Sequence, residues 1–296
     1  MRVIKPVTID AAKLISTDAT ETYSAWSSIT TYNAGDKVIK TSTQRVYQAI
    51  LGANLNKDPE TEVAYWVDIG PTNKWAMFDT SVSTLTSRTG GLSVVIKPGY
   101  VNSLALFGLY GNSLTITVRD GLAGPVVYTN TVSLETSVVA DWYQYFFEPF
   151  SLVSEVTFTD LPPYSDAHIT IDIAGGGTVT CGIVSVGTMY FLGDTQYDCS
   201  VGIIDYSRKD TDEFGVTTLV RRGFSKRLSA TIELDNSQLN NVIRILSDLR
   251  AEPCAWIATD EVGYAALNVF GYYRDFTTSV RYFSRSLCSL EVEGLV

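Results

Sequence analysis

Apolar and polar residues alternate along much of this chain with a period of two residues. Residues 113–119 and 155–159 are clear examples. Such alternation predicts strands with one face on a core and the other in water. Turn signals recur at short intervals between these stretches, at residues 33–36, 88–91, 119–121 and 175–177. This spacing favours antiparallel sandwiches over alternating strands and helices, so we predict a mainly β protein.

One segment has a helical pattern instead. Between residues 236 and 252, apolar side chains recur at helical spacing, at Leu239, Val242, Ile243, Leu246 and Leu249. Asp235 or Asn236 is expected to cap the start of this helix, and Pro253 follows its end. We therefore predict one α-helix over 236–252, with this stripe packed on the core.

Linkers divide the chain into four predicted parts. The segment 69–73 contains Gly, Pro and Asn, and 175–177 is a run of three glycines. The parts are an N-terminal arm (1–21), a small aromatic-rich β module (22–70), a β-sandwich (71–178), and a β domain with a long hairpin and the helix (179–296).

Composition and charge narrow the range of possible functions. The 296 residues carry 22 basic and 32 acidic side chains, a net charge of −10, and 45% of them are apolar. This is enough apolar material for a core, and the acidic balance argues against nucleic-acid binding. We also expect no transmembrane segment, since no apolar run approaches ~20 residues. The first ten residues lack the apolar region of a secretory signal.

Enzyme signals are weak. The single histidine, His168, lies in an alternating stretch and is predicted to be an ordinary strand residue. A Ser-His-Asp triad would depend on it. The glycines at 175–177 lack the Gly-Lys-Ser/Thr of a phosphate loop. Asp58, Glu60 and Glu62 read as a solvated acidic loop, so we predict that the protein is not an enzyme.

The aromatic module carries the most specific pattern. Its order is Trp26, Tyr32, Gly35, Asp36, Val38, Tyr47, Ala49, Pro59 and Trp66. This order resembles the chitin-binding type of carbohydrate-binding module. The resemblance implies structural roles for Trp26 and Trp66 and a surface pair, Tyr32 and Tyr47, for stacking sugar rings. Glycan or cell-surface binding in adsorption and a purely structural or protein-contact role both remain open.

From residue 71 onward the chain resembles structural proteins of the bacteriophage tail tip, of the distal-tail or hub type. The resemblance rests on residues 71–79, 102–109, 145–150, 192–195, 205–209 and 222–227. It implies a tail-tube-like β-sandwich with one flanking helix, made in the bacterial cytoplasm and located in the virion. It also implies a cyclic homo-oligomer, trimer or hexamer, that joins tube proteins to hub and tip proteins.

A charged hairpin is the candidate subunit contact. Its basic residues are Arg208, Lys209, Arg221, Arg222, Lys226 and Arg227. Acidic residues at 205, 210, 212 and 213 accompany them. Mixed charge of this kind suits a solvated hairpin laced with ion pairs, and equally an arm that docks on a neighbouring subunit.

The four cysteines are Cys181, Cys199, Cys254 and Cys288. No two lie within the 2–4 residues typical of a metal knuckle, so from the residues alone they read as buried free thiols with no cofactor. The tail-tip resemblance adds a second interpretation, an iron–sulfur cluster held by these four thiolates.

Overall fold

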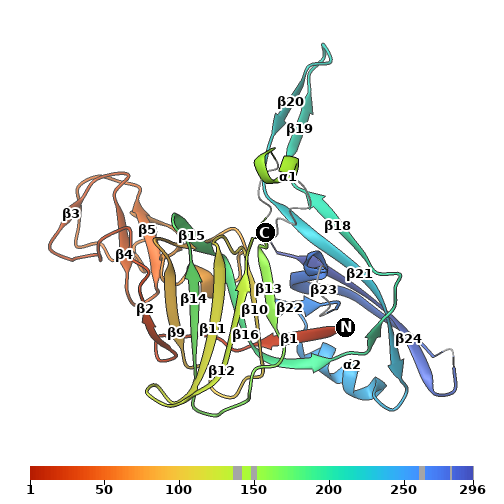
Figure 1. Ribbon diagram of the computed structural model, residues 1–296. Helices are drawn as coiled ribbons and strands as arrows, with labels where there is room; N and C mark the ends of the chain where they lie inside the picture. The colour runs from red at the N-terminus through yellow and green to blue at the C-terminus, as the bar shows by residue number, and fades with distance from the viewer. Residues whose placement is uncertain (136–141, 148–151, 260–263, 281, 296) are drawn as a thin grey trace.

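The computed structural model describes residues 1–135, 142–147, 152–259, 264–280 and 282–295. It confirms a mainly β fold, built on two large antiparallel sheets (Figure 1). The first has ten strands: β13 (Glu155–Phe158), β10 (Ser103–Phe107), β16 (Ile183–Phe191), β1 (Arg2–Pro6), β22 (Cys254–Ile257), β23 (Asn268–Ser279), β24 (Arg285–Gly294), β21 (Phe224–Asp235) and β17 (Asp194–Thr195), with β18 (Ser200–Asp205) also paired to β21. The second has five: β12 (Val126–Ser133), β11 (Ser113–Asp120), β14 (Ala167–Ala174), β9 (Leu92–Ile96) and β2 (Leu14–Thr17).

The five-stranded sheet packs on one end of the ten-stranded sheet. Leu114 and Ile116 of the former and Leu104 and Leu106 of the latter belong to one core and are fully buried. The alternation at 113–119 and 155–159 is therefore confirmed as β11 and β13.

His168 is confirmed as a buried strand residue, with its Nδ1 2.9 Å from the carbonyl oxygen of Asp166. A two-stranded sheet of β8 (Thr86–Thr89) and β15 (Thr178–Cys181) lies beside this sandwich.

The predicted helix is present as α2 (Leu239–Asp248), shorter than 236–252. The prediction that Ile243 faces the core is wrong, because Ile243 is 44% exposed and Ile245 is buried beside Val242 and Leu246. The prediction that Asp235 or Asn236 caps the helix is also wrong. The N-cap residue is Gln238, and its side chain makes no capping hydrogen bond. The amide of Asn236 instead donates to the carbonyl oxygens of the 282–283 turn. A further helix is α1 (Trp142–Phe147).

Strand β1 lies inside the ten-stranded sheet. It pairs antiparallel with β16 on one side and with β22 on the other. Val3 and Ile4, adjacent in sequence, are both fully buried and belong to cores on opposite faces of the sheet. Residues 2–6, which the sequence analysis assigned to a separate N-terminal arm, therefore form an inner strand between two strands assigned to 179–296.

Two smaller units extend from this body. The module consists of β4 (Lys37–Lys40), β5 (Arg45–Ala49) and β7 (Trp66–Pro71) in one sheet and β3 (Thr31–Tyr32) with β6 (Asn54–Leu55) in another. The hairpin of β19 (Arg208–Thr211) and β20 (Thr217–Val220) projects away from the two large sheets (Figure 1). Among the described residues, no helix has the length and apolar character needed to cross a bilayer.

Candidate functional site

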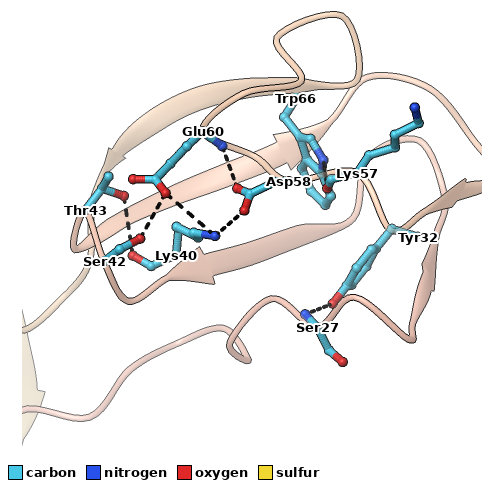
Figure 2. A network of polar contacts seen from close by, with 9 residues as sticks. All are labelled: Ser27, Tyr32, Lys40, Ser42, Thr43, Lys57, Asp58, Glu60 and Trp66. Carbon is cyan, nitrogen blue, oxygen red and sulfur yellow. Dashed lines mark hydrogen bonds and ion pairs between the residues drawn. The ribbon is translucent and has the colours of Figure 1, made fainter.

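The two tyrosines predicted to form the glycan-binding surface of the module lie instead in its core. Tyr32 and Tyr47 are only 9% and 8% exposed, so the expectation that they form a surface pair is wrong. They pack with Val38, Ala49 and Trp66, because a unit of this size has too few aliphatic residues to fill its interior. The rings of Tyr32 and Trp66 meet edge to face at 5.3 Å. Their polar tips are satisfied by backbone: Ser27 N–H donates to the Tyr32 hydroxyl at 2.8 Å, and Trp66 Nε1 donates to the Lys57 carbonyl at 2.9 Å (Figure 2).

The other three rings of residues 22–70 each lie beneath a lysine. The pairs, with the distance from Nζ to the ring centroid, are Lys37 with Tyr23 (5.5 Å), Lys40 with Trp26 (4.7 Å) and Lys57 with Tyr65 (4.9 Å). Such cation–π contacts are favourable, so a sugar ring that stacks on the same face must displace the lysine. Each of the six aromatic rings in residues 22–70, all of which are described, is thus either buried in the module or in contact with a lysine on one face, and Tyr23 remains 36% exposed.

The predicted acidic loop anchors one of these lysines. Lys40 Nζ lies 2.6 Å from an Asp58 carboxylate oxygen and 3.7 Å from a Glu60 carboxylate oxygen (Figure 2). The hydrogen bond from Lys40 holds the pKa of Asp58 below its usual range. The loop therefore does not stand free in solvent, and its carboxylates hold Lys40 over Trp26.

Seven of the eight exposed large apolar residues of the module are aliphatic, and the eighth is Tyr23. The seven are Ile29, Ile50, Leu51, Leu55, Val63, Val67 and Ile69. Aliphatic side chains offer no flat face to a sugar ring, but they suit contact with another protein. Between the two open interpretations of the module, these exposures favour protein contact.

The projecting hairpin is the second candidate surface; we call residues 206–223 the arm. Every residue from 208 to 223 is exposed. Its apolar side chains are among them, with Phe214 91%, Leu219 68% and Val216 61% exposed. Nearby on β18, Ile203 is 72% exposed. The arm thus presents a charged surface and an apolar one together.

The six candidate basic residues divide into three groups. Arg208 pairs with Asp210 at 2.5 Å and Lys209 with Asp205 at 3.4 Å, both locally. Lys226 and Arg227 lie on β21, outside the arm, and pair with Glu155 and Glu291 of the body. Among the described residues, Arg221 and Arg222 have no acidic partner within 4.0 Å. Of the six candidate residues, only Arg221 and Arg222 therefore carry a positive charge that no acidic side chain among the described residues compensates.

The cysteines do not come together. Cys181 lies in the sandwich core, whereas Cys254 and Cys288 lie in the core beneath α2. Cys254 pairs with Gly271, which pairs with Gly294, six residues along β24 from Cys288. At about 3.3 Å per residue this separates the two thiols by about 20 Å along the strands.

This separation does not fit a single cluster held by all four thiolates. A cluster needs thiolate ligands around one small inorganic core. Burial also raises the pKa of Cys181 and of Cys254 to about 12, which keeps both thiols protonated.

A thiol-labelling experiment checks this arrangement. Cys199 is half-buried and the other three cysteines are buried. We expect Ellman's reagent to modify one thiol per chain in the native protein, and four after unfolding in guanidinium. The Cys199→Ser variant should lose the native reaction and keep three thiols on unfolding. Rapid native modification of two or more thiols would contradict the burial described here.

A third feature had no local signal in the sequence. Glu155 of β13, Lys226 of β21 and Asn268 of β23 line one cavity between the strands, together with apolar side chains. These residues lie far apart in the chain, and only the curl of the ten-stranded sheet brings them together. These three features rest on geometry alone, since no family model matches the chain and no curated protein is significantly similar to it.

Proposed function

We propose that this protein is a structural component of a bacteriophage tail tip. In this proposal, copies associate into a cyclic ring through the arm and join tube proteins to tip proteins. The exposed apolar surface of the arm is the observation that carries the proposal. A lone two-stranded hairpin is marginally stable in water, and apolar side chains gathered on a protruding element mark a protein interface.

The charges of the arm fit the same role. Interfaces commonly surround an apolar centre with a polar rim that steers the partner and fixes its register. Arg221 and Arg222 lie at the base of the arm, beside Leu219 and Phe224. Since the chain as a whole carries a net charge of −10, two uncompensated arginines favour an acidic partner surface, which a second copy supplies.

The module takes a secondary place in this proposal. Its exposed aliphatic residues support contact with a neighbouring virion protein. Three of its six aromatic rings are buried and the other three contact a lysine, so its geometry favours protein contact over glycan binding. The sequence resemblance to the tail-tip family supplies the choice of assembly.

The test replaces the apolar surface of the arm without disturbing the body. We expect wild-type protein to form a closed ring, seen by cryo-electron microscopy and as a discrete oligomer in sedimentation velocity. The double variant Phe214→Ser/Leu219→Ser should sediment as a monomer, and its circular dichroism spectrum should match that of wild type because both side chains are exposed in the single chain.

A matched control lies on the same hairpin. Thr217→Ser/Thr218→Ser removes only two methyl groups from the arm, keeps both hydroxyl groups and should assemble like wild type. A wild-type protein that stays monomeric at ~100 μM would overturn the proposal. So would a Phe214→Ser/Leu219→Ser variant that still forms the wild-type ring.

A further inference from the structure

A cavity of about 250 Å³ lies where the curled ten-stranded sheet brings β10 and β13 close to β21, β23 and β24. Most of its wall is apolar, from Val82, Phe107, Phe224, Val269, Phe270 and Leu295. The rings of Phe107 and Phe270 are tilted against each other at 5.8 Å. Such a lining is suited to a flat apolar group, which can meet these rings face to edge.

The polar part of the wall is built from three residues. Lys226 of β21 donates a hydrogen bond to one carboxylate oxygen of Glu155 on β13, and this contact joins the two strands. The other oxygen of that carboxylate, Oε2, is buried and has no hydrogen-bond partner among the described residues. The side-chain oxygen of Asn268 is likewise buried and unpartnered, and the residue is only 5% exposed.

Two unpartnered acceptors in one apolar cavity define the ligand. A buried acceptor without a donor is costly, so a group that brings an N–H or O–H gains affinity by supplying it. An anion is disfavoured by the Glu155 carboxylate and a cation by the Lys226 ammonium. A neutral donor on an apolar frame satisfies all these conditions.

We propose that this cavity binds a neutral aromatic ring that carries a hydrogen-bond donor, of the indole or phenol class. The size agrees, because an apolar cavity of about 150 Å³ accommodates benzene, and 250 Å³ leaves room for a second ring or a substituent. The donor is directed to Glu155 Oε2 and Asn268 Oδ1. The ring packs against Phe107 and Phe270.

An aromatic ring with a hydrogen-bond donor can come from two sources. One is a free small molecule, which is independent of the assembly proposed above. The other is a Trp or Tyr side chain of a second copy, which rests on that proposed function. The experiment separates the two sources.

The test compares indole with indene, which has the same two fused rings but no N–H group. By titration calorimetry on the full chain, we expect indole to bind about tenfold more tightly than indene. Asn268→Leu removes one acceptor at similar volume and should abolish most of this preference. Val82→Trp fills the cavity and should abolish binding of both.

Each result has a defined meaning. Equal affinity for indole and indene, or no binding of indole at millimolar concentration, overturns the proposal, as expected for a cavity that holds only water. If saturating indole dissociates the oligomer, the natural occupant is a side chain of a second copy. If the oligomer persists with indole bound, the occupant is a free molecule. The Phe214→Ser/Leu219→Ser variant should bind indole at least as tightly as wild type, so failure of assembly and failure of this site are distinguishable.

Discussion

The Ile4→Asp variant should fail to fold. Ile4 is fully buried, opposite Met189 on β16 and Ala255 on β22. An aspartate there loses the burial of a large aliphatic side chain and places an unpaired carboxylate in an apolar core. Together these costs exceed about 5 kcal/mol, which approaches or passes the whole stability of an ordinary domain. We expect inclusion bodies on expression and no cooperative thermal transition by circular dichroism.

The neighbouring residue on the same strand is the control. Lys5 is half-buried, so Lys5→Asp reverses a charge without placing one in the core. This variant should fold and melt within a few degrees of wild type. If Ile4→Asp kept the wild-type spectrum and melting temperature, β1 would be a detachable arm rather than a strand of the sheet.

The second large effect is expected for Lys226→Met. Lys226 is the counter-charge of Glu155, and the two side chains are only 27% and 13% exposed. Removing the ammonium leaves a carboxylate without its partner in a largely apolar wall, at a cost of about 3 kcal/mol in the free energy of unfolding. Denaturation in urea at neutral pH measures this cost. Adding Glu155→Gln should recover most of the loss, because the unpaired charge is then gone.

Arg227→Met supplies a matched control on the adjacent residue. Arg227 of β21 pairs with Glu291 of β24, with its Nη2 2.7 Å from the carboxylate and side chains that are 44% and 33% exposed. An exposed pair contributes at most about 1 kcal/mol. A loss in Arg227→Met as large as that in Lys226→Met would contradict the distinction between the two pairs.

The pH dependence of Lys226→Met has a definite sign. Burial raises the pKa of Glu155 above its usual value, and the attraction of Lys226 opposes this rise. Without Lys226 the pKa of the folded state rises further. A carboxyl whose folded pKa exceeds its unfolded pKa favours the folded state at low pH and loses that contribution as pH rises through the folded value. The destabilisation should therefore shrink as pH falls toward the usual glutamate range.

Local patterns in the sequence were sufficient for individual elements. The alternation at 113–119 reports a strand with one buried face, and the stripe from Leu239 to Leu249 reports a helix. These signals depend only on neighbours along the chain. Which strands pair with one another depends on residues far apart in the chain. Nothing in residues 2–6 therefore indicates that they lie between β16 and β22.

The candidate sites show the same limit. The spacing of Tyr32, Tyr47 and Trp66 located a compact aromatic unit, but ring positions do not say which face is inward. In so small a unit the rings had to serve as core. The arm was predicted from its charged residues, whereas the exposure of Phe214 and Leu219, on which the proposed interface depends, is apparent only in the structure. Glu155 and Asn268 come from separate strands, so their meeting had no sequence signal.

The place of β1 has a consequence for how the chain is made. Its partners end at Phe191 and at Ile257, so β1 completes its pairing only after the chain has been translated beyond Ile257. Closing such long loops slows folding, since many contacts must wait for a costly loss of chain entropy. Until then the edge of β1 that pairs with β22 is open. Strand exchange between nascent neighbours therefore competes with correct folding, and slower expression at low temperature should raise the soluble yield.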